Sequence, residues 1–172
     1  MPWKNGGGIT HEIALTEGPN GFAWRLSIAE VASSGPFSKF DGKERILTVI
    51  EGNGIDLVSS DQKLSARKKH PVAFSGETDI DGQLIDGPIR DFNLIFDPGT
   101  VAATVKIVEN EETPIPLNHN QKVVVHAVEG AATISGKKIA QSDTLIASGD
   151  ELSSAFVRSE GWAIIVVLSS IS

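Results

Sequence analysis

The sequence contains no cysteine and no tyrosine, and only one methionine among its 172 residues. Without cysteine, neither a disulfide-stabilised scaffold nor a thiolate metal site is possible. No apolar run approaches the roughly 18 residues that a membrane-spanning helix requires. The N-terminus also lacks the basic segment and apolar core of a signal peptide. We therefore expect a cytoplasmic protein with no membrane partner.

Positive charge is scarce as well. The chain has 15 Lys and Arg against 22 Asp and Glu, a formal net charge of −7. Nucleic-acid-binding domains need a basic face, and the one basic cluster, Arg67-Lys68-Lys69, is interpreted as a solvated loop. We expect no nucleic-acid partner. A chain of this length buries roughly 70% of its unfolded surface and forms one domain or two small halves that share a core.

Amphipathic helices are also missing, because no 12-residue window shows helical apolar periodicity. Short apolar or alternating runs are separated throughout by glycine, proline, serine and asparagine. This pattern is typical of an all-β sandwich or barrel. Residues 78–87 and 109–120 are interpreted as polar connections. The expected strands are 9–15, 22–31, 45–50, 55–58, 63–66, 71–74, 89–96, 102–108, 123–128, 132–135, 138–140, 144–147, 155–158 and 162–168.

The order of these strands repeats once along the chain. In each half a strand ends in Glu-Gly, a hairpin follows, a short strand ends in Ser-Gly, and a further strand closes the series. The Glu-Gly pairs are Glu51-Gly52 and Glu129-Gly130, and the Ser-Gly pairs are Ser75-Gly76 and Ser148-Gly149. The repetition favours a duplicated β-barrel unit, with halves at residues 1–100 and 101–172.

Polar side chains share faces on two of the alternating strands. Arg25 and Ser27 project together on one strand, and Asp91 and Asn93 project together on another. Such faces meet solvent in an ordinary sandwich but line the lumen in a small barrel. Alanines beside the first pair and isoleucines beside the second favour the lumen. An arginine there needs a partner or an anion, because an unpaired buried charge is very costly, and Asp91 is one candidate partner for Arg25.

These side chains could form a carboxylate site. Positive charge would come from Lys4, Arg25 and Arg45. Hydrogen bonds that select polar groups of the ligand would come from Asn5, Ser27, Ser38 and Asn93.

The start of the chain places Trp3, Lys4 and Asn5 before three consecutive glycines. Glycine loses the most conformational freedom on folding, so such a run suits a backbone that approaches something closely. A flexible leader is the other interpretation. We expect residues 3–8 to form a lid or wall of the first barrel that presents Lys4 and Asn5 toward Arg25 and Ser27.

Four separated motifs resemble the HutD/Ves family and cover most of residues 2–96. They are Pro2–Ala14, Trp24–Glu30, Gly35–Gly42 followed by Arg45, and Asp91–Asn93. The resemblance implies a bicupin fold, with two cupin-like halves, in a bacterial cytoplasmic protein. It also implies a metabolite-responsive modulator of histidine utilisation, or of a stress response in the Ves branch, rather than an established catalyst. A formylated or formiminated glutamate is the implied ligand class.

Metal and nucleophile motifs are absent. Metal-dependent cupins carry a His-x-His motif, but the corresponding turn here is Ile50-Glu51-Gly52-Asn53-Gly54. No Gly-x-Ser-x-Gly elbow and no P-loop is present. The four histidines show no close ligand spacing and are His11, His70, His119 and His126. We therefore expect no metal and no cofactor.

The favoured function is metal-free binding of a small carboxylate-bearing metabolite. A hydrolase or isomerase with Lys4 or Asp91 as acid or base stays open, as does a homodimer contact through Trp3-Lys4 and Phe37-Phe40. The expected ligand-binding residues are Trp3, Lys4, Asn5, Gly6, Trp24, Arg25, Ser27, Phe37, Ser38, Arg45, Asp91 and Asn93.

Overall fold

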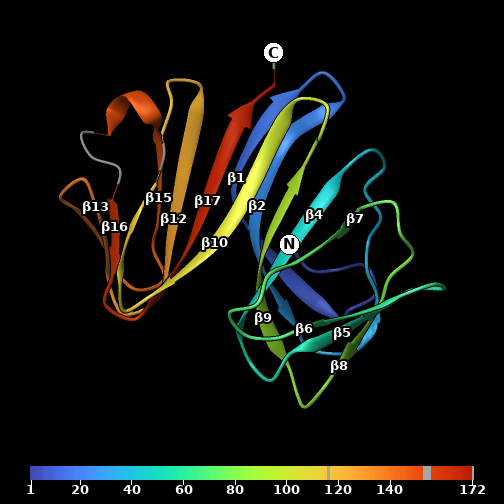
Figure 1. Cartoon of the computed structure of the whole chain (residues 1–172). Helices are drawn as coiled ribbons and strands as arrows, with labels where there is room; N and C mark the ends of the chain where they lie inside the picture. The colour runs from blue at the N-terminus through green and yellow to red at the C-terminus, as the bar shows by residue number, and fades with distance from the viewer. Residues whose placement is uncertain (116, 153–155, 172) are drawn as a thin grey trace. The chain divides into compact units, whose positions relative to one another are not determined.

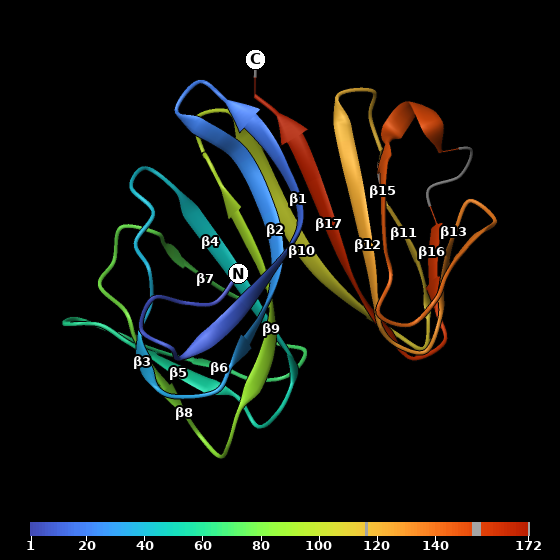
Figure 2. The same cartoon turned by 180° about the vertical axis from the view of Figure 1, so that it is seen from behind.

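The structure is a computed structural model that describes residues 1–115, 117–152 and 156–171. The chain forms two compact units, Met1–Thr100 and Val101–Ser172, and both consist of antiparallel strands (Figures 1 and 2). Within the described ranges, the only helix is a single 3-10 turn at Gly149–Glu151. None of the described helical residues forms a span long and apolar enough to cross a membrane. The all-β prediction is confirmed.

Unit one contains two sheets, with strand orders β1-β2-β9-β4-β7 and β3-β8-β5-β6. The long strands belong to the first sheet, which carries most of the alternating residues. The bounds are β1 Gly8–Gly18, β2 Gly21–Val31, β3 Gly35–Pro36, β4 Glu44–Glu51, β5 Ile55–Val58, β6 Lys63–Ala66, β7 Val72–Ser75, β8 Asp81–Leu84 and β9 Ile89–Phe96.

Unit two also contains two sheets, with strand orders β10-β17-β12-β15 and β11-β16-β13-β14. The bounds are β10 Val101–Glu109, β11 Glu112–Pro114, β12 Gln121–Glu129, β13 Ala132–Ile134, β14 Lys137–Ile139, β15 Thr144–Ser148, β16 Phe156–Ser159 and β17 Trp162–Ser170. Residue 155, at which an expected strand begins, lies outside the described residues.

The two units share one topology. When β2–β9 are matched in order to β10–β17, both sheets of unit one reproduce those of unit two, and β1 is the addition. The Glu-Gly pairs mark the same feature, because the register shifts between Val49 and Glu51 and again between Ala127 and Glu129. Each irregularity precedes a glycine with positive φ, 94° at Gly52 and 69° at Gly130. The predicted internal repeat is confirmed.

Three strands were missed by sequence reasoning: β3, β8 and β11. They hold two to four residues each, rich in glycine, proline and acidic side chains, and show no apolar alternation. Their strand character comes from pairing with distant partners, such as Gly35 with Gly82 and Glu112 with Arg158. The segments 78–87 and 109–120, expected to be polar connections, therefore contain the short strands β8 and β11.

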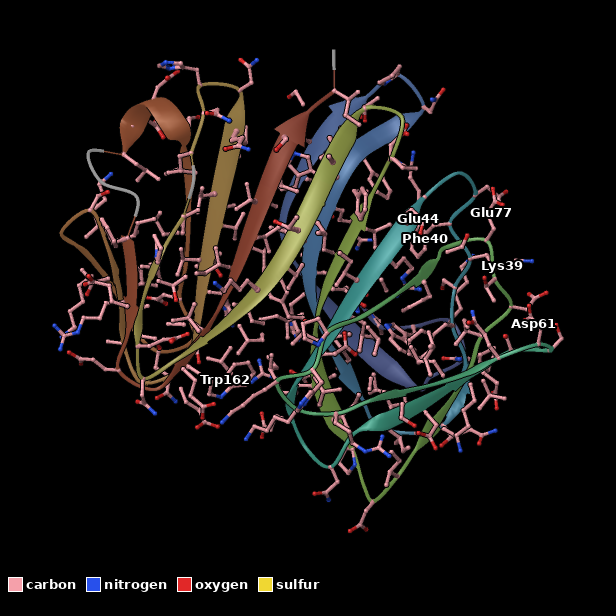
Figure 3. All side chains as sticks on the ribbon, in the orientation of Figure 1. Lys39, Phe40, Glu44, Asp61, Glu77 and Trp162 are labelled. Atoms are coloured by element: carbon pink, nitrogen blue, oxygen red, sulfur yellow. The ribbon has the colours of Figure 1, made fainter. Side chains whose placement is uncertain are left out.

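Each unit has its own apolar core. In unit one, Leu47, Val49, Ile55 and Leu57 are fully buried in a cluster, while Lys39, Asp61 and Glu77 project outward (Figure 3). In the first sheets the strand registers place Arg45, Asn93 and Asp91 of unit one where unit two has Val123, Ile165 and Ala163. The buried polar group is thus a feature of unit one alone at this position.

Candidate functional site

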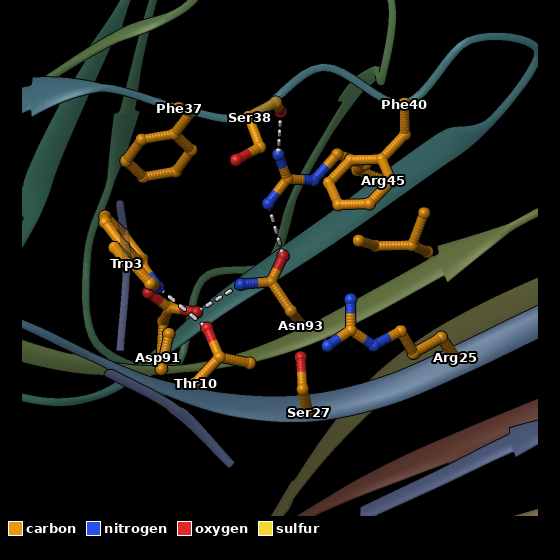
Figure 4. Close-up of a pocket in the computed structure, with 12 residues that line it drawn as sticks. Trp3, Thr10, Arg25, Ser27, Phe37, Ser38, Phe40, Arg45, Asp91 and Asn93 are labelled. Atoms are coloured by element: carbon orange, nitrogen blue, oxygen red, sulfur yellow. Dashed lines mark hydrogen bonds between the residues drawn. The ribbon is translucent and has the colours of Figure 1, made fainter. Parts of the chain in front are cut away.

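A cavity of about 70 Å³ lies inside unit one, against the face of the first sheet (Figure 4). Its walls come from β1, β2, β4 and β9, together with the N-terminal segment and the segment between β3 and β4. The lining residues of this inner cavity are Trp3, Thr10, Arg25, Ser27, Ala29, Phe37, Ser38, Phe40, Arg45, Asp91, Asn93 and Ile95.

Strand alternation brings the two polar faces together. On β2, the side chains of Arg25 and Ser27 line the cavity, and β9 contributes Asp91 and Asn93. The β2–β9 register places Ser27 directly opposite Asn93. Both faces therefore line the cavity, whose other wall includes Trp3, Phe37 and Phe40.

Arg45 is the buried cation of this cavity, with only 6% of its surface exposed. Its Nη2 donates to Oδ1 of Asn93 at 3.0 Å, and its Nη1 donates to the carbonyl oxygen of Ser38 at 3.3 Å. Its Nε has no hydrogen-bond partner among the described residues. Burial lowers the pKa of Arg45 to about 10, although the charge of Asp91 acts in the opposite direction.

Three aromatic rings surround the Arg45 guanidinium. Its central carbon lies 5.5 Å from the ring centre of Phe37, 5.4 Å from that of Phe40 and 5.0 Å from that of Phe74. Cation–π contacts of this kind favour the charged form and restrict the side chain. The guanidinium is therefore charged and fixed in position, and it presents donors to the cavity.

Asp91 lies beneath Arg45 and is 1% exposed. Asn93 links the two residues, since its amide nitrogen donates to Oδ1 of Asp91 while its Oδ1 accepts from Arg45. Oδ2 of Asp91 lacks a partner within the described part of the chain. Burial raises the pKa of Asp91 to about 7, although Arg45 and the Asn93 hydrogen bond both act to lower it. One proton therefore decides the charge of this group near neutral pH.

Arg25 forms its ion pair with Glu12 and not with Asp91, which was one candidate partner. The Nε of Arg25 lies 3.0 Å from Oε1 of Glu12. The β1–β2 register sets Glu12 opposite Ser27, so the carboxylate reaches Arg25 from the neighbouring edge strand. That contact depends on how β1 pairs with β2, which residue alternation alone does not reveal.

The glycine run folds as a closed turn that holds Trp3. The Trp3 amide donates to the Gly8 carbonyl at 2.8 Å, and the Trp3 ring packs edge-on against Phe37 at 5.9 Å. A Cβ at Gly8 would lie 2.5 Å from the Glu30 carbonyl oxygen and 3.1 Å from the Trp3 ring. Gly6 has a φ of 72°, a left-handed conformation that favours glycine. The run therefore holds Trp3 in the wall of the inner cavity, while the glycines themselves do not line it. The role of residues 3–8 as a lid stays a prediction.

A wider cavity of about 450 Å³ adjoins the inner one. Trp3, Thr10, Arg25, Phe37, Ser38 and Phe40 line both, so the outer cavity is the mouth of the inner cavity. The residues that line only the outer cavity are Met1, Pro2, Lys4, Asn5 and Pro36. Lys4 is exposed there, so its charge faces the entrance and not the interior.

Two expected site residues line neither cavity, Gly6 and Trp24. Trp24 is buried, but it lies on the opposite face of β2 from Arg25. Sequence reasoning omitted Thr10, which accepts a 2.8 Å hydrogen bond from the Trp3 indole nitrogen. It also assigned Phe40 only to a dimer contact. Trp3, Phe37 and Phe40 line the cavities within one chain, and the homodimer stays a prediction.

Metal-binding clusters are not found in the described ranges, where no three His, Asp or Glu side chains could together hold an ion. His11 bonds Glu30, and His126 bonds Thr144 in unit two. The expectation of no metal and no cofactor stays a prediction.

Gly82 on β8 makes room for the Phe37 wall. A Cβ there would lie 2.5 Å from Cε1 of Phe37, so we expect Gly82→Ala to push the ring into the cavity and to destabilise the protein by about 1–3 kcal/mol. Gly35→Ala is the matched control on the paired strand, because its nearest contact would be 3.7 Å away. Urea unfolding of both variants tests this expectation. Equal unfolding midpoints would contradict it.

Comparison with known proteins places this chain in a family. The family model described as HutD matches residues 1–165. HutD from Pseudomonas fluorescens SBW25, solved in a formate condition, is 35% identical with a TM-score of 0.87, covering 100% of this chain and 94% of that one. A conserved protein of unknown function from Pseudomonas aeruginosa PAO1 is also 35% identical, with a TM-score of 0.84 and the same coverage.

Curated relatives show similarity over shorter stretches. An uncharacterised 21.2 kDa protein in the hutC 3' region of Pseudomonas putida is 50% identical over 103 residues, which are 57% of this chain and 53% of that protein. Protein Ves from Escherichia fergusonii is 39% identical over 114 residues, which are 64% of this chain and 60% of that protein. The chain thus spans little more than half the length of these relatives.

The fold is also similar to that of a cupin 2 conserved barrel domain protein from Leptotrichia buccalis, with a TM-score of 0.57. The match covers 95% of this chain and 89% of that chain, and at 8% identity it shows the fold alone. Both halves are cupin-like, in agreement with the predicted bicupin. With the family model matching nearly the whole sequence, this chain belongs to the HutD family, which is linked to histidine utilisation.

Proposed function

We propose that this chain is a metal-free receptor for a small carboxylate-bearing metabolite of the formylglutamate kind, and that it modulates histidine catabolism in the bacterial cytoplasm. The observation that carries the proposal is the buried, charged guanidinium of Arg45 lining the inner cavity. A buried cation whose donors meet one carbonyl and one neutral amide favours an anion as its further partner.

The sizes of the two cavities support the ligand class. The inner cavity, about 70 Å³, accommodates a few waters or one small planar group such as a carboxylate or formyl group. The outer cavity, about 450 Å³, has room for the remainder of a glutamate-sized molecule. Arg25 and Lys4 lie there and supply positive charge for further carboxylates.

Hydrogen-bonding groups at the boundary support a polar ligand. Ser27 and Asn93 stand opposite each other on neighbouring strands, and Ser38 lines both cavities. The aromatic rings of Trp3 and Phe37 pack edge-on against each other and line both cavities. The Pseudomonas fluorescens relative was solved in a formate condition, and formate is a carboxylate small enough for a cavity of about 70 Å³.

Titration calorimetry at pH 6 with formylglutamate, glutamate, urocanate and formate tests the proposal. We expect formylglutamate to bind most tightly and formate to bind more weakly, because formate occupies only the inner cavity. Arg158→Gln is the control variant, since Arg158 is an exposed arginine of unit two that lines neither cavity of the site. If none of the four compounds binds at millimolar concentration, the proposed ligand class is contradicted.

Catalysis is the second candidate function, and the raised pKa of Asp91 favours it, because a general acid or base operates best with a pKa near 7. A hydrolase or isomerase would use Asp91 next to the bound metabolite. Incubation of chelator-treated protein with histidine-pathway intermediates, followed by chromatography, tests this function. No product after long incubation at high protein concentration would count against it.

A further inference from the structure

Three connected groups determine the charge inside the inner cavity. The Arg45 guanidinium donates to Asn93, and Asn93 donates to Asp91, so the three side chains form one hydrogen-bonded chain (Figure 4). All three are at least nine-tenths buried. With Asp91 ionised the chain carries no net charge, and with Asp91 protonated it carries one positive charge.

We propose that binding of an oxyanion in the inner cavity is coupled to the uptake of one proton by Asp91. This inference rests on the proposed function and adds a regulation of the same site by pH. Asp91 is here a positioning residue, since it acts on the ligand through Asn93 and through the charge of the group.

The other charged side chains near the inner cavity are either paired or exposed, so Arg45 and Asp91 determine the charge inside it. On β2, Arg25 faces the same cavity, but Glu12 of β1 pairs with it at 3.0 Å. Lys4 of the N-terminal segment is exposed at the mouth. The segment between β3 and β4 contributes Phe37, Ser38 and Phe40, which carry no charge.

An ionised Asp91 opposes the binding of a second anion. Two negative charges would then share one buried cation, and like charges in a site of low dielectric constant repel strongly. The partner-free Oδ2 of Asp91 lets the carboxyl group take up a proton without losing a hydrogen bond from a described residue. Burial raises the pKa of Asp91 to about 7, so the carboxyl group is about half protonated at neutral pH in the free protein and its full protonation costs little free energy.

The coupling predicts a defined dependence of affinity on pH. Below about pH 6 Asp91 is already protonated, so the dissociation constant for a carboxylate is constant. Above about pH 7 each further pH unit weakens binding about tenfold, because a proton must first be bound. Binding at pH 8.5 is then about thirty-fold weaker than at pH 6, and each ligand bound takes up close to one proton.

Calorimetry of formate and formylglutamate between pH 6 and 8.5 tests the coupling. Each titration is run at the same pH in two cationic amine buffers with different ionisation enthalpies and no small oxyanion, so that proton uptake is read from the difference in heat. Asp91→Asn is expected to bind with an affinity independent of pH, about tenfold or more tighter than the parent at pH 8.5, and with no proton uptake. If this variant does not fold, NMR of the Asp91 carboxyl carbon in the parent, with and without formate, reports whether that group takes up the proton; an unchanged titration of the carbon overturns the role of Asp91.

The outcomes separate this inference from the proposed function. Binding by the parent that is independent of pH and takes up no proton overturns the coupling and leaves the receptor function standing. Absence of binding of both compounds at every pH overturns the receptor function and the coupling together. A pH dependence that persists unchanged in Asp91→Asn assigns the proton to another group and overturns the role of Asp91.

Discussion

Replacement of Arg45 by methionine is expected to abolish carboxylate binding in the inner cavity. The variant removes the buried cation that lines the inner cavity. The loss of a buried charged hydrogen-bonding partner weakens binding by about 2–5 kcal/mol, equivalent to roughly thirty-fold or more. Methionine fills a similar volume and makes favourable contacts with the three surrounding rings, so the fold is expected to survive. Calorimetry with formylglutamate at pH 6 provides the measurement.

Arg25→Met is the matched comparison for Arg45→Met. Arg25 lies at the boundary of the two cavities and already pairs with Glu12, which is half exposed. Its loss removes a partly screened charge and is expected to weaken binding by less than tenfold. An Arg45→Met variant that binds as tightly as Arg25→Met would show that the ligand does not depend on the buried guanidinium.

The ligand-free protein is expected to lose stability as pH rises from about 4 to 7 because of Asp91. Its pKa is about 7 in the folded chain against an ordinary value of 3.8. Between these values the unfolded chain has released the proton while the folded chain still holds it, so rising pH favours unfolding. The upper limit is roughly 4 kcal/mol, since each pH unit in this interval carries about 1.4 kcal/mol.

Comparison of the parent with Asp91→Asn isolates this effect. Other carboxyl groups act in the opposite direction, because hydrogen bonds from Lys63 and Ser65 lower the pKa of Asp56 to about 2. A backbone hydrogen bond from Gly99 likewise lowers the pKa of Asp97, so both groups reduce stability as pH falls. Urea unfolding at pH 5 and pH 8 gives the free energy of unfolding of both proteins. We expect the difference between Asp91→Asn and the parent to shift in favour of the variant at pH 8. An unchanged difference between the two proteins would contradict the raised pKa of Asp91.

Much of the fold could be predicted from local patterns. Alternation on residues 22–31 and 89–96 correctly placed Arg25 and Ser27 with Asp91 and Asn93 on cavity-facing sides. The repeated Glu-Gly pairs revealed the duplication, because each pair forms the same bulge and left-handed turn. The short strands β3, β8 and β11 were not predictable, since they form only by pairing across the second sheets.

The candidate site was only partly predictable. Arg45, Ser38 and Trp3 were correctly grouped with the lumen residues, but Trp24 points to the other side of its strand. Thr10 carries no signal beyond its place in an alternating strand, and its contact with the Trp3 indole depends on how the N-terminal turn folds back.

The sequence by itself determined the strand class, the internal repeat and the faces on which the polar side chains lie, because period-two alternation and turn residues are local properties. The tertiary structure alone decided which of those side chains meet. The pairing of β1 with β2 placed Glu12 beside Arg25, and the pairing of β9 with β4 brought Arg45 close to Asn93 and Asp91. The tertiary structure also raised the pKa of Asp91, because the burial of the carboxyl group depends on every layer around it and not on its neighbours along the chain.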